Sequence, residues 1–134
     1  MDQETLVTED REAAEVLIDR FGKKWPVQTA FWLKSVENGR WILYIAAQGI
    51  EHSNVDQGYR EVLRQLKEMR PVYLDPFQVE LITVDDPLVP AVETILQRHP
   101  ENRAFYYKGS RLGGMSIGGA YLYPPLTAVP ANQG

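Results

Sequence analysis

Eight polar side chains with the potential for binding or catalysis fall in three short segments of the chain. They are Glu51, His52, Ser53, Asp85, Asp86, Lys108, Ser110 and Arg111. The lysine and the arginine would attract an anion, whereas the carboxylates and the histidine could transfer protons or bind a divalent cation. We therefore treat the set as a candidate ligand-binding site and assign no catalytic residue within it.

His52 beside Glu51 is the pair most typical of a general base or a metal ligand. The chain has 2 histidines and no cysteine, which excludes a three-histidine cluster within one chain. A divalent-cation site would need Glu51, His52, Asp85 and Asp86 together, and a Ser-His-Asp arrangement has no nucleophile elbow to support it. The simpler interpretation is that His52 precedes a helix cap and that the two aspartates end a strand and cap a helix. We prefer it, and expect neither a metal ion nor a cofactor.

A glycine-rich segment follows Lys108 and includes Arg111. Its glycines are Gly109, Gly113, Gly114, Gly118 and Gly119. Backbone amides in such a segment can approach a phosphate, with the two cations supplying charge. The spacing matches neither G-x-G-x-x-G nor the P-loop pattern, and no helix start follows it. We favour a hairpin loop whose glycines make room for another backbone or a large aromatic side chain.

The segment Gln28–Gln48 contains two β-rich runs joined by Asn38-Gly39. This dipeptide is typical of a two-residue type I′ turn, which would place Leu33 opposite Tyr44. Side chains alternate between the two faces of a strand, and here both faces are apolar. The hairpin therefore needs cover on both sides, from helices, from the C-terminal tail or from a second subunit.

The remaining elements follow from hydrophobic periodicity and from capping residues. Helices are predicted over residues 8–22, 54–70 and 86–99, and strands over 77–84, 103–108 and 120–123. The order α-β-β-α-β-α-β-β predicts an α+β or α/β fold, with helices covering a mixed sheet of four to five strands. We expect a single domain over residues 1–123 and a flexible C-terminal tail over residues 124–134.

Two strand–helix–strand segments are long enough for parallel crossovers. If both are parallel, the carboxyl ends of three strands meet at one edge of the sheet, where open α/β sheets bind ligands. The loops 48–53, 85–86 and 108–119 would then gather there. This topology is the basis for grouping the eight candidate residues.

Composition narrows the class of protein. The chain has 134 residues, 44% hydrophobic and 24% charged, which is ordinary for a soluble globular domain. No apolar run approaches the roughly 20 residues that span a bilayer, so we expect no membrane association. The absence of cysteine and the acidic N-terminus favour a cytoplasmic protein. The net charge of −4 argues against nucleic-acid binding through bulk electrostatics.

Three functions fit these features, and the sequence leaves open whether the protein is an enzyme. The first is a non-catalytic interaction or assembly domain, forming a homodimer through a sheet edge or an aromatic face. The second is a domain that binds a small molecule or anion at the three gathered loops. The third is a nucleic-acid-associated protein, which the acidic balance makes the least favoured. We favour the homodimeric interaction domain.

Overall fold

The computed structural model describes Leu6 and residues 8–70, 74–99 and 102–124. Its helices are α1 (Thr8–Gly22), α2 (Val55–Glu68) and α3 (Leu88–Gln97), with a 3-10 turn η1 (Pro76–Gln78). Its strands are β1 (Val27–Lys34), β2 (Trp41–Ala47), β3 (Val79–Ile82), β4 (Phe105–Tyr107), β5 (Arg111–Leu112), β6 (Met115–Ser116) and β7 (Gly119–Leu122).

Five strands form one mixed sheet in the order β3-β2-β1-β7-β4, and β5 pairs with β6 in a separate hairpin. β2 and β3 run parallel, as the crossover through α2 predicts. The other pairs in the sheet are antiparallel. The predicted fold class, a mixed sheet covered by helices, is confirmed.

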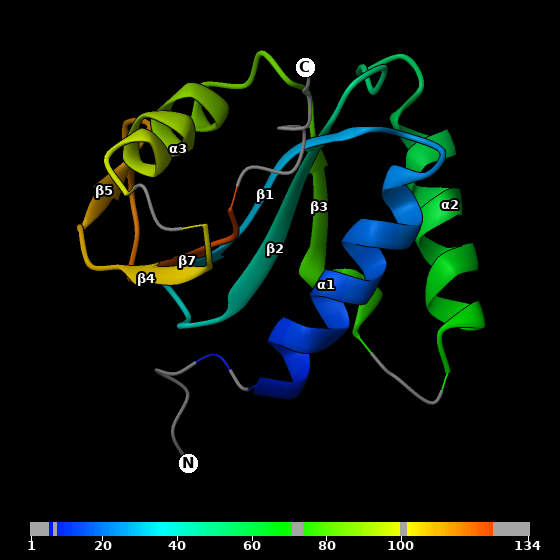
Figure 1. The fold of residues 1–134 in the computed structure, drawn as a ribbon, viewed down its shortest axis with the longest axis horizontal. Helices are drawn as coiled ribbons and strands as arrows, with labels where there is room; N and C mark the ends of the chain where they lie inside the picture. Colours follow the sequence, from blue (N-terminus) through cyan, green and yellow to red (C-terminus); the bar gives the residue numbers. More distant parts are fainter. Residues whose placement is uncertain (1–5, 7, 71–73, 100–101, 125–134) are drawn as a thin grey trace.

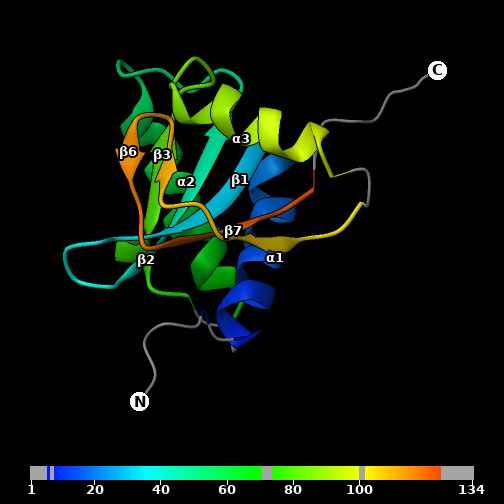
Figure 2. The same ribbon diagram turned by 90° about the vertical axis from the view of Figure 1, so that its left-hand side faces the viewer.

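Helices cover both faces of this sheet. Figure 1 shows α1 and α2 together on one side, with α3 and β5 on the other. Figure 2 views the second side, where α3 crosses the strands and the β5–β6 hairpin lies beside it. Trp32 and Leu43 point into the core under α1 and α2, whereas Phe31 and Leu33 point into the core under α3. The two-sided apolar hairpin is thus covered on both faces, as its sequence required.

The hairpin between β1 and β2 has a different register from the predicted one. Phe31 lies opposite Tyr44 and Leu33 opposite Ile42, a shift of two residues from the two-residue turn. The amide of Gly39 donates to the carbonyl of Ser35 at 3.0 Å, so the turn is longer. Gly39 has a positive φ of 70°, but Asn38 does not, so the turn cannot be type I′. Because the shift is an even number, the paired side chains of β1 and β2 keep their predicted faces. Val36, which alternation predicts on the face of Trp41, lies in the turn and instead lines a groove with Ile42 and Tyr44.

The strand and helix after α2 start at other residues than predicted. β3 begins only at Val79, because Asp75 accepts a hydrogen bond from the amide of Phe77 at 2.9 Å and holds a 3-10 turn there. Phe77 is consequently 87% exposed instead of sharing the buried face of β3. The third helix begins at Leu88, two residues before Pro90, and the carboxylate of Asp86 accepts from the Leu88 amide at 2.9 Å. Asp86 thus accepts a hydrogen bond at the start of the helix, but the N-cap position is Pro87, one residue later than predicted.

The buried face of α2 also differs from the predicted stripe. Helical spacing predicts an apolar stripe of Val55, Tyr59, Val62, Leu63, Leu66 and Met69. Leu63 is 53% exposed, whereas Glu61 and Gln65 are buried. The rest of the stripe packs on the core, and Glu61 and Gln65 are buried beside it, where Gln65 meets Arg20 of α1. Within the described residues, no helix combines the length and the apolar character that crossing a bilayer requires. Apart from Pro124, the predicted tail lies outside the described residues.

Candidate functional site

The sheet topology brings two of the three predicted loops together and separates the third. β4 pairs with β7 at the far edge of the sheet, antiparallel to it, and is not a third parallel strand. Its carboxyl end therefore lies at the opposite end of the sheet from those of β2 and β3. The prediction that all three loops share one edge is wrong, because it assumed a second parallel crossover through α3.

Glu51, His52, Ser53 and Asp85 line one shallow depression of about 460 Å³. The side chain of Asn54 shapes the first loop: its oxygen accepts from the Glu51 amide at 2.7 Å, and its nitrogen donates to the Gly49 carbonyl at 2.8 Å. The hydroxyl of Thr83 donates to the Asp85 carboxylate. These contacts are internal to each loop and account for its conformation.

The charges around this depression do not suit an anion. Glu51 and Asp85 are acidic, and Asp86 beside them is engaged in a hydrogen bond at the start of α3. Lysine and arginine are absent from the described lining, so a phosphate or carboxylate would meet repulsion. Among the described residues, no three His, Cys, Asp or Glu side chains are grouped so that they could hold a metal ion.

The other three candidates lie elsewhere. The guanidinium of Arg111 donates to the Gly114 carbonyl at 2.8 Å and to the Ser116 hydroxyl at 3.2 Å, which braces the β5–β6 hairpin. The carbonyl of Ser110 accepts from the Ile117 amide at 2.9 Å and closes the same unit. Lys108 lines a separate depression of about 370 Å³ with Trp41, Tyr106, Gly118 and Gly119, which we call the aromatic depression.

The glycines have mainly steric roles, in agreement with the favoured interpretation of this segment. Gly113 and Gly114 both have positive φ, 58° and 82°, between the paired residues Leu112 and Met115. They form the tight two-residue turn that the sequence had suggested at Asn38-Gly39. At Gly109 a Cβ atom would lie 2.3 Å from the hydroxyl oxygen of Tyr107, so the glycine accommodates that ring.

An apolar groove, missed at the level of sequence, lies between the β1–β2 turn and the β5–β6 hairpin. It has a volume of about 230 Å³, and we call it the turn groove. Val36 and Met115 line it and are 58% and 42% exposed, while Ile42 and Tyr44 form its half-buried floor. The sequence feature that could have indicated this groove is the excess of apolar residues on both faces of the β1–β2 hairpin. Locating the groove required the position of the β5–β6 hairpin.

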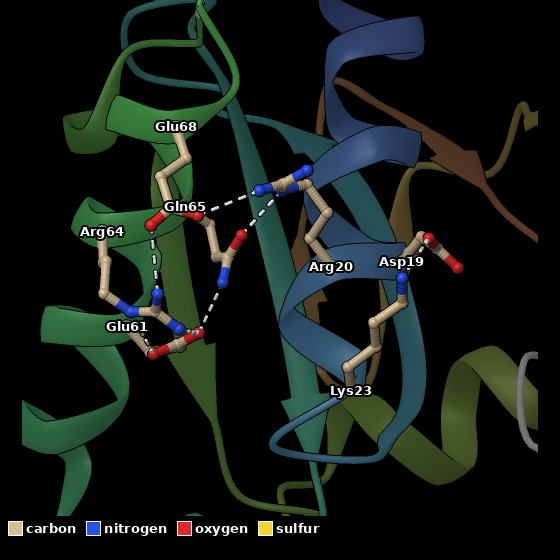
Figure 3. A network of polar contacts seen from close by, with 7 residues as sticks. All are labelled: Asp19, Arg20, Lys23, Glu61, Arg64, Gln65 and Glu68. Atoms are coloured by element: carbon tan, nitrogen blue, oxygen red, sulfur yellow. Dashed lines mark hydrogen bonds and ion pairs between the residues drawn. The ribbon is translucent and has the colours of Figure 1, made fainter.

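A buried polar network joins α1 to α2, as Figure 3 shows. The carboxylate of Glu61 accepts from the Gln65 side-chain amide at 2.7 Å and from the Nη2 and Nε atoms of Arg64 at 2.8 and 3.1 Å. Gln65 in turn accepts from the Arg20 side chain of α1 at 2.7 Å. Burial alone would raise the pKa of Glu61, but the hydrogen bonds from Gln65 and Arg64 outweigh it and lower that pKa. We interpret this network as structural, since every polar group in it has a partner within the protein.

Comparison of the chain with protein-family models, with curated protein sequences and with solved structures gave no match.

Proposed function

We propose that this protein is a non-catalytic interaction domain that pairs with a second copy of itself through the turn groove. The observation that carries the proposal is the gathering of exposed apolar side chains there. Val36 of the β1–β2 turn and Met115 of the β5–β6 hairpin are exposed there, beside the half-buried Ile42 and Tyr44. Burying such a surface against a partner is favourable by about 25 cal/mol per Å² of apolar area, before the costs of association.

The charges at the groove suit a second copy of the same chain. Lys34 and Glu37 are the two charged side chains in its described lining. Neither forms an ion pair among the described residues. In a two-fold dimer every contact between the copies occurs twice, with the roles of the copies exchanged. Lys34 of each copy can therefore face Glu37 of the other. A second copy of the chain offers both a positive and a negative partner for these side chains. A different protein with a purely acidic or purely basic surface would match only one of them.

Pairing through the β3 edge, one of the two edges of the sheet, is disfavoured. The amide of Leu81 on this edge strand donates to the Tyr59 hydroxyl at 2.9 Å. The amide of Val79 donates to the carbonyl of Pro76. With these donors engaged, an incoming strand would find fewer partners along this edge.

Light scattering coupled to gel filtration over a concentration series tests the proposal. We expect a dimer for the natural chain and a shift toward monomer for Val36→Asp and Met115→Asp. Leu63→Asp is the matched control, because Leu63 is also exposed but lies on α2, on the other side of the sheet. A natural chain that remains monomeric at every concentration would refute the proposal, as would dimers that both groove variants leave intact.

A charge exchange tests the pairing itself. Lys34→Glu alone places like charges together and should weaken the dimer, as should Glu37→Lys alone. The double variant carrying both changes restores opposite charges and should recover most of the lost affinity. Additive losses in the double variant would show that these two side chains do not face each other.

A further inference from the structure

We propose that the aromatic depression binds a small anionic molecule that carries a planar aromatic ring. The depression lies at the end of the sheet where β1 ends and β2 begins. Its volume of about 370 Å³ falls in the range of small-molecule sites. This proposal does not depend on dimer formation.

The depression is hollow because one row of the sheet lacks a side chain. Trp41 pairs with Lys34 on the neighbouring strand, and Lys34 pairs with Gly119 on the next. The indole of Trp41 extends across this row, so that a Cβ atom at Gly119 would lie 3.4 Å from its Cη2 atom. Gly119 has no positive φ, so its backbone does not require glycine. Its missing side chain leaves space beside the indole.

Tyr106 supplies an aromatic wall that the surrounding contacts hold in place. Its ring packs edge-on against Trp41 with centroids 6.3 Å apart, and against Tyr121 with centroids 4.7 Å apart. Its hydroxyl donates to the Leu6 carbonyl at 3.3 Å, and the Arg11 guanidinium lies 5.9 Å from the ring centre. The residue is nevertheless 38% exposed. A fixed and accessible ring favours stacking of a planar ligand, because little conformational entropy is lost on binding.

One ammonium group gives the depression its preference for anions. Lys108 lines the depression and is exposed. It forms no ion pair within the part of the chain that the structure describes. An anionic group attached to the ring can therefore pair with Lys108 while the ring contacts Tyr106. A neutral aromatic molecule would make only the ring contact, and an anion without a ring would make only the ion pair.

Titration calorimetry and amide NMR shifts with defined probes test the proposal. Adenosine monophosphate and indole-3-carboxylate represent two sources of a planar aromatic anion. We expect at least one of them to bind saturably, with shifts at Trp41, Lys108 and Gly119. Adenosine and inorganic phosphate, which each carry one half of the chemistry, should bind about tenfold more weakly or worse. No saturable binding of either aromatic anion overturns the proposal, and phosphate binding as tightly as the nucleotide overturns its aromatic part.

Variants then locate the binding. Lys108→Gln should weaken it about tenfold, and Gly119→Val, which fills the hollow, should abolish it. Lys67→Gln is the matched control, since Lys67 is an exposed lysine on α2. The melting temperature of each variant is measured as a control for folding. If Gly119→Val does not fold, Gly119→Ala, which a strand tolerates, replaces it in the binding experiment. Unchanged affinity in both Lys108→Gln and the glycine variant would place the binding elsewhere and refute the assignment.

Discussion

The two faces of the sheet are covered in different ways. Under α1 and α2 the core is closed: Trp32 is fully buried, and its indole donates to the Tyr123 hydroxyl at 2.9 Å. That hydroxyl donates in turn to the Arg11 carbonyl of α1 at 3.0 Å, which ties the helix to the sheet. Under α3 the cover is one helix and the short β5–β6 hairpin, and it leaves Ile42 and Tyr44 half-exposed on β2.

The difference shows that an apolar pattern on both faces of a strand does not imply equal burial of both. β1, in the middle of the sheet, is closed on both sides, with Phe31, Trp32 and Leu33 all buried. β2 lies nearer the edge, and on its α3 side Ala46 is buried whereas Ile42 and Tyr44 are half-exposed. The open part of this side coincides with the turn groove, so its apolar residues remain available for association.

The largest expected effect contrasts one residue from each face. Trp32→Ala removes a fully buried indole and leaves the Tyr123 hydroxyl without one partner, so we expect a loss of about 3–5 kcal/mol in the free energy of unfolding. Ile42→Ala, on the open part of the α3 face, should cost only about 1 kcal/mol, because its side chain is already half-exposed. Urea denaturation followed by circular dichroism measures both. Equal losses would contradict the unequal closure of the faces.

The polar network on the two-helix side gives the next largest effect. Glu61→Ala removes the acceptor of Gln65 and leaves a buried amide without its partner, which should cost about 1–3 kcal/mol. Glu68→Ala is the matched control, because this carboxylate is exposed and its ion pair with Arg20 is worth about 0–1 kcal/mol. Denaturation of the two variants under the same conditions compares them. If Glu61→Ala lost no more free energy of unfolding than Glu68→Ala, burial would not strengthen the network.

The same carboxylate predicts a pH dependence. The hydrogen bonds of Glu61 lower its pKa in the folded state, so the folded protein favours the charged form more than the unfolded chain does. The stabilisation is present in full above the ordinary value of 4.5 and is lost as the pH falls through the lower folded pKa. The difference in melting temperature between the natural chain and Glu61→Gln should therefore shrink below about pH 4.5. A difference that stays constant down to pH 3 would assign the stabilisation to packing alone.

The fold class could be predicted because it depends on local patterns. Periodicity and caps located the three helices, and alternation assigned the paired side chains of β1 and β2 to the correct face, but not Val36 in the turn between them. That assignment survived a register error, since a shift of two residues keeps every paired side chain on its side of the sheet. The local sequence also indicated that the Asp86 carboxylate accepts a hydrogen bond at the start of a helix, although the N-cap is Pro87.

The grouping of the candidate residues could not be predicted, because it depends on which strands pair over long distances. The short strand Phe105–Tyr107 pairs with β7 instead of extending the parallel pair, and this moves Lys108 to the opposite end of the sheet. The burial of Glu61 and Gln65 was missed for a related reason. Their polar character indicates solvent, and only the position of α1 reveals the partners that bury them.

The smallest expected effect concerns the turn beside the open part of the α3 face. In a type I′ turn Asn38 would have a positive φ, and alanine there would cost about 1–2 kcal/mol. In the observed turn Asn38 lacks a positive φ and contributes one exposed hydrogen bond, from the Arg40 amide to its side chain at 3.0 Å. Asn38→Ala should therefore change the free energy of unfolding by about 0.5 kcal/mol or less. Gly39→Ala, at a φ of 70°, is the control that should lose about 1 kcal/mol. Equal losses in the two variants would restore the two-residue turn and, with it, the register that places Leu33 opposite Tyr44.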